Sequence, residues 1–394
     1  MSTLKVNTIR HTGASSDAVT LASDGTCTAK ITNNLSNRNL IINGDMQVAQ
    51  RGTQFTEQSG IAYHLDRWEI NAYNLDTGRY QVDQVNDAPD GFKKSLKYSC
   101  TTANGSPNVN EQLYAQQQIE AQNVDWLKFY HASPDKVTLS FHVKANNTGT
   151  YGAALKLGDD NSTENSTDTR NYEFQYTISS ANTWEKKTIT ITLDNDTNQT
   201  KSTGTSFGMA VQFWLSAGTN RDGVTSLLTW GGNGNATSGV ANKTFFSSTN
   251  NNFFITGVQL EKGDTATDFE HRSYGDELAR CQRYYQTLGG SPNKSLFTPA
   301  TGNGTAVVTA FYKASVTFRA VPAYSYSALG DLEVYDFGAS TSRGSPTGSA
   351  LIGSISNKDW IYIDNNTSST TAGAGHMFRA NNTAQARFNL SAEL

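Results

Sequence analysis

Apolar and polar side chains alternate with a period of two residues in several separate stretches of the chain. In residues 137–143 the odd positions are Val, Leu, Phe and Val, and the positions between them are Thr, Ser and His. The same alternation returns in residues 172–178, 189–193 and 207–215. Because successive side chains of a strand point to opposite faces of its sheet, each stretch predicts a half-buried β-strand.

Gly, Asn, Ser and Asp gather between these strands, as in residues 158–163 and 231–235, and predict turns and loops. No repeat of fixed period is present, which disfavours a solenoid or a propeller. We therefore expect an all-β fold whose central part is an antiparallel sandwich of jelly-roll type.

The first 40 residues form a different, shorter pattern. Residues 4–9 and 18–21 are short strand candidates, and Asp24-Gly25 is a turn pair that is typical of hairpins. Strands this few and this polar bury little surface by themselves, so we expect a partner surface or further copies of the segment to hold them. The alternative is a loose terminal arm.

A helical pattern follows the sandwich. Ser273-Tyr-Gly-Asp276 has the spacing of a capping box, and apolar residues recur at helical intervals up to Gly289-Gly290. Alternation then resumes in residues 332–336, 360–363 and 384–390, which predicts a second, smaller β-domain. The expected organisation is an N-terminal β segment (1–40), a jelly roll (41–272), a helical connector (273–290) and a C-terminal β domain (291–394).

Composition adds that the surface is polar without being ionic. Charged residues are 17% of the 394 residues, against about 25% in typical domains, and the net charge is −4. The 18 Phe, 17 Tyr and 6 Trp residues supply core material, which argues against disorder. The pI near 5.9 and the lack of a basic block argue against nucleic-acid binding.

Export and membrane insertion are not expected. No stretch approaches the roughly 20 apolar residues that span a bilayer, and residues 1–5 are not followed by the apolar core of a signal peptide. Cys27, Cys100 and Cys281 are odd in number and far apart, which is not the pattern of a disulfide framework; one disulfide pair is the alternative. A reducing cytoplasm is the simplest place for this chain to fold.

Catalytic and metal motifs are absent from the sequence. The six histidines have no metal-ligand spacing, and there is no Gly-x-Ser-x-Gly elbow or phosphate-binding glycine loop. Residues 194–198 imitate the start of a calcium loop, but Gln199 and Thr205 replace its glycine and its glutamate. We expect no enzymatic activity. Glycan hydrolysis stays open as an alternative, because carboxylate pairs of glycosidases are close in space and not in sequence.

Two tryptophans are candidate ligand contacts. Trp214 follows a core residue in its strand, so its ring is predicted to point away from the core, and Trp230 precedes a loop that contains Asn233 and Asn235. Aromatic faces beside amide side chains suit sugars, whose C–H groups pack on rings while their hydroxyls bond to amides. Packing at a trimer interface for Trp214 and anchoring of the loop for Trp230 are the alternatives.

Several motifs together resemble phage tail-fibre and receptor-binding proteins. The residues that carry the resemblance are Asn39-Leu-Ile-Ile-Asn-Gly-Asp-Met-Gln-Val-Ala-Gln-Arg51-Gly, Asp66-Arg-Trp68, Ile255-Thr-Gly-Val-Gln-Leu-Glu-Lys-Gly-Asp264, Thr267-Asp-Phe-Glu270 and Glu277-Leu-Ala-Arg-Cys-Gln-Arg-Tyr-Tyr285. The opening residues 4–9 look like the start of structural proteins from short-tailed marine phages, including those that infect cyanobacteria.

The resemblance implies a homotrimeric virion fibre with a carbohydrate-binding jelly roll. Related jelly rolls often hold a structural calcium ion between their first and last strands, here the strands that carry Asp45 and Glu261; the two carboxylates could equally be solvated or paired with Arg51 and Lys262. The chain lacks the long tail-attaching domain of many podovirus fibres, so attachment to the tail or to an adaptor protein is expected to rest on residues 1–40.

The sequence therefore favours a non-enzymatic adhesin that is assembled in the host cytoplasm, resides in the virion and binds a host-surface polysaccharide or lipopolysaccharide. A polysaccharide-depolymerising tailspike and a structural connector or capsid-decorating fibre are the alternatives. Within the trimer, Leu278, Cys281 and Tyr285 are expected to face either the domain junction or a threefold axis.

Overall fold

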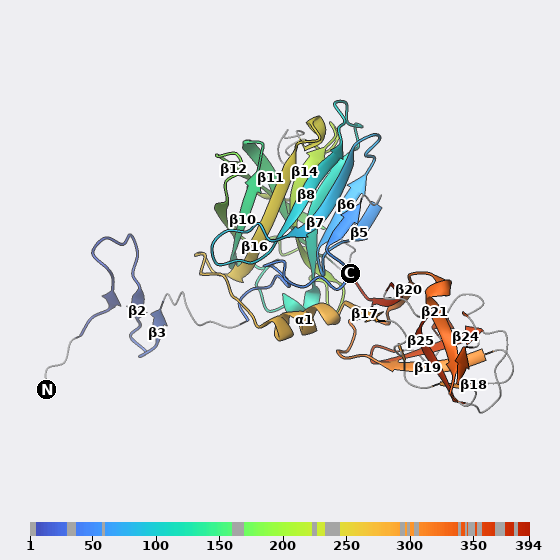
Figure 1. The fold of residues 1–394 in the computed structure, drawn as a ribbon. Coiled ribbons are helices and arrows are strands. Elements are labelled where there is room, and N and C mark those ends of the chain that lie inside the picture. The colour runs from blue at the N-terminus through green and yellow to red at the C-terminus, as the bar shows by residue number, and fades with distance from the viewer. Residues whose placement is uncertain are drawn as a thin grey trace.

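The computed structural model describes residues 5–29, 37–56, 60–159, 169–222, 227–232, 245–291, 296–297, 300–302, 307–337, 340–342, 345, 351–352, 357–366, 375–381 and 385–394. The described part is almost entirely β-strand, with one α-helix. Figure 1 shows a small N-terminal sheet, a two-sheet sandwich with the helix at its base, and a smaller C-terminal β-domain. The predicted all-β class is confirmed. No described helix has the length and apolar character needed to cross a bilayer.

Two antiparallel sheets form the sandwich. The six-stranded sheet runs β13 (Glu185–Thr192), β10 (Lys136–Ala145), β16 (Asn252–Lys262), β8 (Ser95–Thr102), β7 (Arg79–Val85) and β4 (Gln54–Thr56). The seven-stranded sheet runs β15 (Trp230–Gly232), β12 (Arg170–Ile178), β11 (Gly149–Leu157), β14 (Phe207–Ala217), β9 (Gln112–Glu120), β6 (Glu69–Tyr73) and β5 (Gly60–Tyr63). Short 3-10 turns are η1 (Ala121–Asn123) and η2 (Phe245–Ser247). Strands distant in sequence are neighbours in both sheets, which gives the jelly-roll-like architecture.

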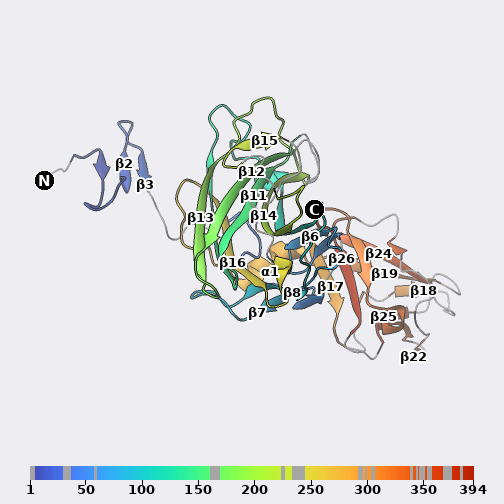
Figure 2. The same cartoon turned by 90° about the horizontal axis from the view of Figure 1, so that it is seen from above.

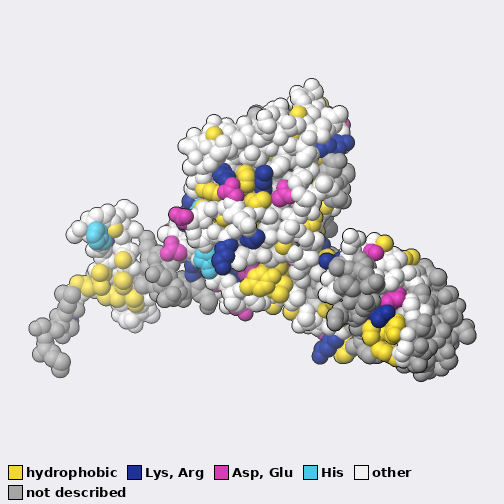
Figure 3. All heavy atoms as spheres, viewed as in Figure 1, with side chains coloured by type: hydrophobic (Ala, Val, Ile, Leu, Met, Phe, Trp, Pro, Cys, Tyr) yellow, Lys and Arg dark blue, Asp and Glu magenta, His cyan; other side chains and the backbone are white. Residues whose placement is uncertain are grey.

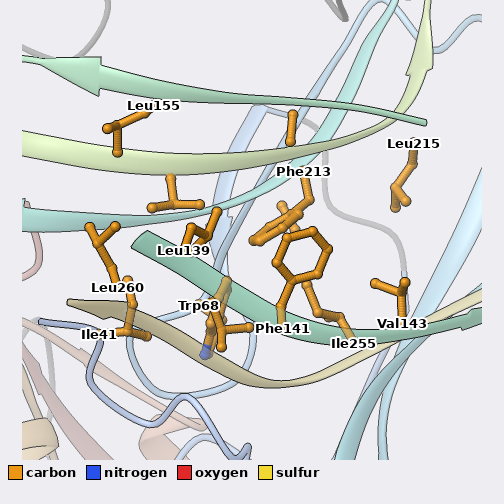
Figure 4. Close-up of a cluster of buried hydrophobic side chains, with 14 of the residues drawn as sticks. Ile41, Trp68, Leu139, Phe141, Val143, Leu155, Phe213, Leu215, Ile255 and Leu260 are labelled. Carbon is orange, nitrogen blue, oxygen red and sulfur yellow. The ribbon is translucent and has the colours of Figure 1, made fainter. Parts of the chain in front are cut away.

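The core lies between the two sheets and follows the predicted alternation. The odd-numbered residues of β10, from Val137 to Val143, are all buried in it. Figure 4 shows Phe141 and Phe213 facing each other from the two sheets. Their ring centroids are 4.9 Å apart, and the rings meet edge to face. Aromatic pairs in this geometry add to the hydrophobic stabilisation of burial.

His64 is a buried ionisable group in this region and makes the fold acid-sensitive. Its ring contacts Phe55 and Tyr80 at centroid distances of 5.2 and 6.2 Å, and desolvation lowers its pKa from 6.5 to about 4. Between these two pH values the unfolded chain binds a proton that the folded chain does not. The free energy of unfolding is therefore expected to decrease as the pH falls through this window, by about 3 kcal/mol at most.

Urea denaturation at about pH 7 and about pH 4.5 tests this expectation. A His64→Gln variant should lose a large part of the pH dependence, whereas His131→Gln, at an exposed histidine, should retain it. An unchanged pH dependence in His64→Gln would contradict the assignment.

The N-terminal sheet is amphipathic and stands apart from the sandwich (Figure 1). It consists of β1 (Thr8–Ile9), β2 (Val19–Leu21) and β3 (Cys27–Ala29), and Gly25 has the positive φ of 84° that its hairpin turn requires. Ile9 pairs with Val19, and Leu21 pairs with Cys27, so apolar side chains share one face. Ile9 is 55% exposed and Leu21 is 38% exposed. Figure 3 shows hydrophobic side chains at the surface of this segment.

The helix α1 (Tyr274–Gln282) begins as predicted but ends earlier. Ser273 is the N-cap, and its hydroxyl accepts a hydrogen bond from the Asp276 amide at 3.2 Å. The predicted connector of residues 273–290 is wrong beyond the helix: β17 (Tyr285–Gly289) is a strand that pairs with β26 (Arg387–Ser391). The C-terminal strand offers hydrogen bonds and burial that are far away in sequence, and these outweigh the local helical spacing.

The C-terminal domain has its own core. A three-stranded sheet contains β17, β26 and β20 (Ala323–Tyr326), and the 3-10 turn η3 (Leu329–Asp331) directly precedes the first residue of β21 in the second sheet. That sheet runs β22 (Thr341–Ser342), β21 (Leu332–Asp336), β25 (Gly375–Ala380), β18 (Ala300–Gly302), β19 (Val307–Lys313), β24 (Trp360–Asn366) and β23 (Leu351–Ile352). Val308, Phe318, Leu332, Phe378 and Phe388 are among its buried residues.

The motifs quoted above for the resemblance meet at the base of the sandwich. The Trp68 indole donates to the Asn43 carbonyl at 2.9 Å, and the Asn43 amide group donates to the carbonyls of Val48 and Asp66 at 2.9 and 3.0 Å. The Arg51 guanidinium lies 3.6 Å from the centre of the Tyr285 ring. These residues therefore build the junction that joins the sandwich, α1 and the C-terminal domain, which Figure 2 shows from above.

Candidate functional site

Trp214 points away from the main core, as its position in β14 predicts, but it is covered. Only 3% of it is exposed, and it forms a small separate cluster with Tyr114, Ala154 and Ala217. The Tyr114 and Trp214 ring centroids are 4.5 Å apart. A ring this buried has no face left for a sugar in this conformation, so Trp214 is a packing residue here.

A row of polar side chains lies beside Trp214 on the same face of the seven-stranded sheet. Gln212 donates to Gln116 at 2.9 Å, and Gln116 donates to Glu69 at 2.6 Å. Gln118 donates to the other carboxylate oxygen of Glu69 at 3.0 Å. All four side chains are buried. Because these amides donate to Glu69 and to one another, the row links the strands rather than presenting these donors to solvent.

Glu69 and Glu173, two buried carboxylates on this face, lie too far apart to act together in glycoside hydrolysis. The register places Glu69, Gln116, Gln212, Ala154 and Glu173 on five neighbouring strands in one row. Neighbouring strands are about 4.8 Å apart, so Glu69 and Glu173 are separated by about 19 Å. Glycosidase carboxylates are about 5–10 Å apart.

Trp230 lies on the opposite face of the sheet from Trp214. It pairs with Tyr172, the two ring centroids are 5.3 Å apart, and its indole donates to the Thr192 carbonyl at 2.8 Å. It packs against the main core. The contacts favour anchoring of the chain, and the two tryptophans do not form one platform. Asn233 and Asn235 lie outside the described residues.

Asp45 and Glu261 have separate sets of partners. Asp45 lies in a loop and accepts a hydrogen bond from Gln47, while Glu261, in β16, accepts from Gln259 and from the Thr267 amide and hydroxyl. The suggested pairing with Arg51 and Lys262 is wrong. Arg51 instead binds Glu393 at 2.8 Å and Lys262 binds Asp135 at 2.9 Å.

These surroundings do not fit a calcium site. The guanidinium Nε of Arg38 lies 3.6 Å from Glu261, where its positive charge would repel a cation. Within the part of the chain that the structure describes, no group of three or more His, Cys, Asp or Glu side chains is arranged to hold a metal ion.

Cys281 and Tyr285 lie buried at the junction between the sandwich and the C-terminal domain, and Leu278 is half-buried on α1. Burial raises the pKa of the Cys281 thiol, so it stays protonated at neutral pH. All three cysteines are free, and Cys27 is the exposed one.

An exposed aromatic surface lies on the C-terminal domain, on strands β19 and β24. Phe311 pairs with Tyr362, and Lys313 pairs with Trp360, so the four side chains occupy two adjacent rungs of one sheet face. The Phe311 and Tyr362 ring centroids are 5.4 Å apart, and the Lys313 ammonium lies 5.6 Å from the centre of the Trp360 ring. Phe311 is 39% exposed and Trp360 is 47% exposed. We call these four residues the β19–β24 surface.

The opposite face of the same strands holds this surface in place. Ala310 and Ile361 are buried in the C-terminal core. The Tyr312 hydroxyl donates to the Gln286 side chain at 2.6 Å, and burial raises the pKa of Tyr312, which keeps that donor protonated. The rings are therefore presented from a rigid sheet and not from a loop.

Sequence reasoning did not identify the β19–β24 surface, although part of its signal is visible. Trp360 and Tyr362 flank the apolar Ile361, so period-two alternation places them on one face. Nothing local indicates that Phe311 and Lys313, about fifty positions earlier, pair with them. The register of a long-range strand pair is set by the whole domain.

Comparison with known proteins finds likeness in structure alone. No protein-family model and no curated protein matches the sequence. A tailspike domain of bacteriophage CBA120 matches 57% of this chain, which covers 21% of that structure, with 14% identity and a TM-score of 0.31. A putative sugar-binding protein from Bacteroides thetaiotaomicron matches 57% of this chain over its full length (100%), with 11% identity and a TM-score of 0.31. A tandem CBM22 domain from Paenibacillus barcinonensis matches 91% of this chain and 98% of its own, with 8% identity and a TM-score of 0.28.

Proposed function

We propose that this chain is a non-enzymatic adhesin of a phage virion that binds a host-surface glycan through the β19–β24 surface. The observation that carries the proposal is the exposure of Phe311 and Trp360 on one rigid sheet face. The C–H groups of sugar rings pack on aromatic faces, and the neighbouring lysine donates hydrogen bonds to sugar oxygens.

The size of the surface favours a sugar over a protein partner. Aromatic side chains bury about 150–250 Å² each, so the exposed parts of Phe311 and Trp360 amount to about 200 Å². A stable protein interface buries about 800 Å² on each partner. One or two sugar rings match the available area.

Trp360→Ala tests the site. Titration of surface polysaccharide or lipopolysaccharide from the host should show an affinity about 5- to 150-fold weaker, because a stacking contact is worth about 1–3 kcal/mol. Trp126→Ala is the matched control: Trp126 is 52% exposed, and Lys262 lies 5.5 Å from its ring, so the same kind of pair is removed from the sandwich. Equal affinity of Trp360→Ala and Trp126→Ala would remove the β19–β24 surface from the proposal.

The proposal includes a homotrimer that residues 1–40 attach to the tail or to an adaptor protein. The apolar face of Ile9, Val19, Leu21 and Cys27 supports it, because three short strands cannot cover such a face themselves. Ile9 and Leu21 on this face are 55% and 38% exposed, so the face is open to a partner. Several weak glycan sites acting together would give avidity.

Cys27 provides a direct test of the association. It is the exposed thiol, whereas Cys100 and Cys281 are buried, so a short bis-maleimide should link copies through residue 27 in the intact protein. Covalent dimers that disappear in Cys27→Ser, together with a trimeric mass in solution, are the expected result. A monomeric mass at micromolar concentration with no cross-linking would exclude self-association and leave a tail protein as the partner of this face.

The enzymatic alternative is a depolymerase, which would cleave the bound polysaccharide and release reducing ends. If the chain releases no reducing ends from the polysaccharide that it binds, the adhesin proposal stands. Release of reducing ends would replace it with a tailspike activity. A purely structural fibre, by contrast, would bind no glycan, and antibodies that mask it would leave phage adsorption unchanged.

A further inference from the structure

We infer that the glycan bound by the β19–β24 surface is acidic, with a carboxylate that the Lys313 ammonium recognises. This inference rests on the proposed function and specifies its ligand. It is carried by the Lys313 ammonium, which lies 5.6 Å from the centre of the exposed Trp360 ring.

Two exposed lysines flank Trp360. Lys313 is its partner in the register and lies 5.6 Å from the ring centre. Lys358 precedes it by two residues and is also exposed, and its backbone carbonyl is fixed by the Phe318 amide at 2.9 Å. One ammonium, that of Lys313, therefore lies beside the stacking ring, and Lys358 is a second exposed lysine two residues before it in the sequence.

The nearest carboxylate in sequence is already engaged. Asp359 accepts a hydrogen bond from the hydroxyl of Thr317, which lies in the segment that follows β19. Among the described residues neither Lys313 nor Lys358 forms an ion pair, in contrast to Lys144 and Lys187, which pair with Asp87 and Glu185. The ammonium of Lys313 is therefore available to a ligand that packs on Trp360.

This arrangement matches a sugar that carries a carboxylate on its ring. The ring face would lie on Trp360 and Tyr362, while the carboxylate at its edge would meet the lysine ammonium. Rings two residues apart in a strand are about 6.8 Å apart, so one sugar ring covers one aromatic ring and the next sugar reaches the second. A neutral glycan would use the rings alone and leave the ammonium groups solvated.

The experiment compares polygalacturonate with its fully methyl-esterified form, which has the same backbone without the charge. The intact protein should bind the acid about two- to fivefold more tightly at low salt, as expected for an exposed ion pair, and the difference should shrink as salt screens the charge. Lys313→Gln should abolish the preference, and Lys313→Arg should retain it.

Lys262→Gln is the control, since Lys262 accompanies the exposed Trp126 on the sandwich. It should leave the preference unchanged. Equal binding of acid and ester, or a preference that survives in Lys313→Gln, would overturn the inference while the adhesin proposal stands. Failure of both polymers and of host polysaccharide to bind would instead contradict the proposed function itself.

Discussion

Replacing Glu393 by Gln is expected to lower the free energy of unfolding by about 3–5 kcal/mol, the cost of leaving a buried charge without its partner. Glu393 is the second-last residue of the chain, yet its side chain is only 6% exposed. One carboxylate oxygen accepts from Arg51 at 2.8 Å, and the other accepts from Arg67, whose side chain is 1% exposed. Removal of the carboxylate would leave two guanidinium groups at the junction without their anion.

The same substitution should also loosen the C-terminal domain. Glu393 follows β26, and the Arg319 guanidinium donates to the Ala392 and Glu393 carbonyls and to the Thr205 carbonyl of the sandwich. The Tyr63 hydroxyl donates to the Leu394 carbonyl at 3.1 Å. The last two residues therefore fasten the C-terminal domain to the sandwich.

Thermal and urea unfolding measure the effect on stability, and limited proteolysis between the domains measures the loosening. Lys262→Gln, which breaks the partly exposed pair with Asp135, should cost less than about 1 kcal/mol. A cost for Glu393→Gln no larger than that of Lys262→Gln would show that the junction does not depend on this carboxylate.

Asn43→Ala is the second substitution with a large expected effect, a loss of about 3–4 kcal/mol. The side chain donates to the carbonyls of Val48 and Asp66 and accepts from the Val48 amide at 2.9 Å. Its backbone has a φ of 56°, which Asn tolerates and Ala does not without strain. Loss of the side chain would leave buried polar groups unpaired and add backbone strain.

Two further variants separate these contributions. Asn43→Gly removes the same hydrogen bonds but relieves the strain, so it should be about 1 kcal/mol less destabilised than Asn43→Ala. Asn182→Ala changes an exposed turn residue with a φ of 55° and should lose about 1 kcal/mol through strain alone. If Asn43→Ala were no worse than Asn182→Ala, the hydrogen bonds of Asn43 would contribute little.

The parts of the fold that the sequence predicts are those that local periodicity determines. Alternation in residues 137–143 correctly assigned the side of β10 that faces the core between the sheets, and Ser273 with Asp276 correctly marked the start of α1. The prediction of a half-buried strand was wrong, because Thr138 and Ser140 on the other side are buried as well. The end of the helix was wrong because Tyr285 pairs with Ser391, about a hundred positions away. Local spacing carries no information about such a partner.

The same limit applies to the candidate site. The period-two alternation placed Trp214 on the correct face of its strand. The alternation does not show whether other side chains cover that face, as they do here. Trp360 and Tyr362 show the same period-two alternation around Ile361, and both are partly exposed to solvent. Their significance emerged from Phe311 and Lys313, which only the folded domain brings beside them.

Hydroxyl-radical footprinting of the intact chain, with and without saturating host polysaccharide, tests the central claim most directly because it reports the solvent access of individual side chains. The account predicts that the glycan protects Phe311, Trp360 and Tyr362 from oxidation and leaves Trp126, an equally exposed ring on the sandwich, unprotected. Protection of sandwich side chains with Trp360 still fully oxidised would contradict it.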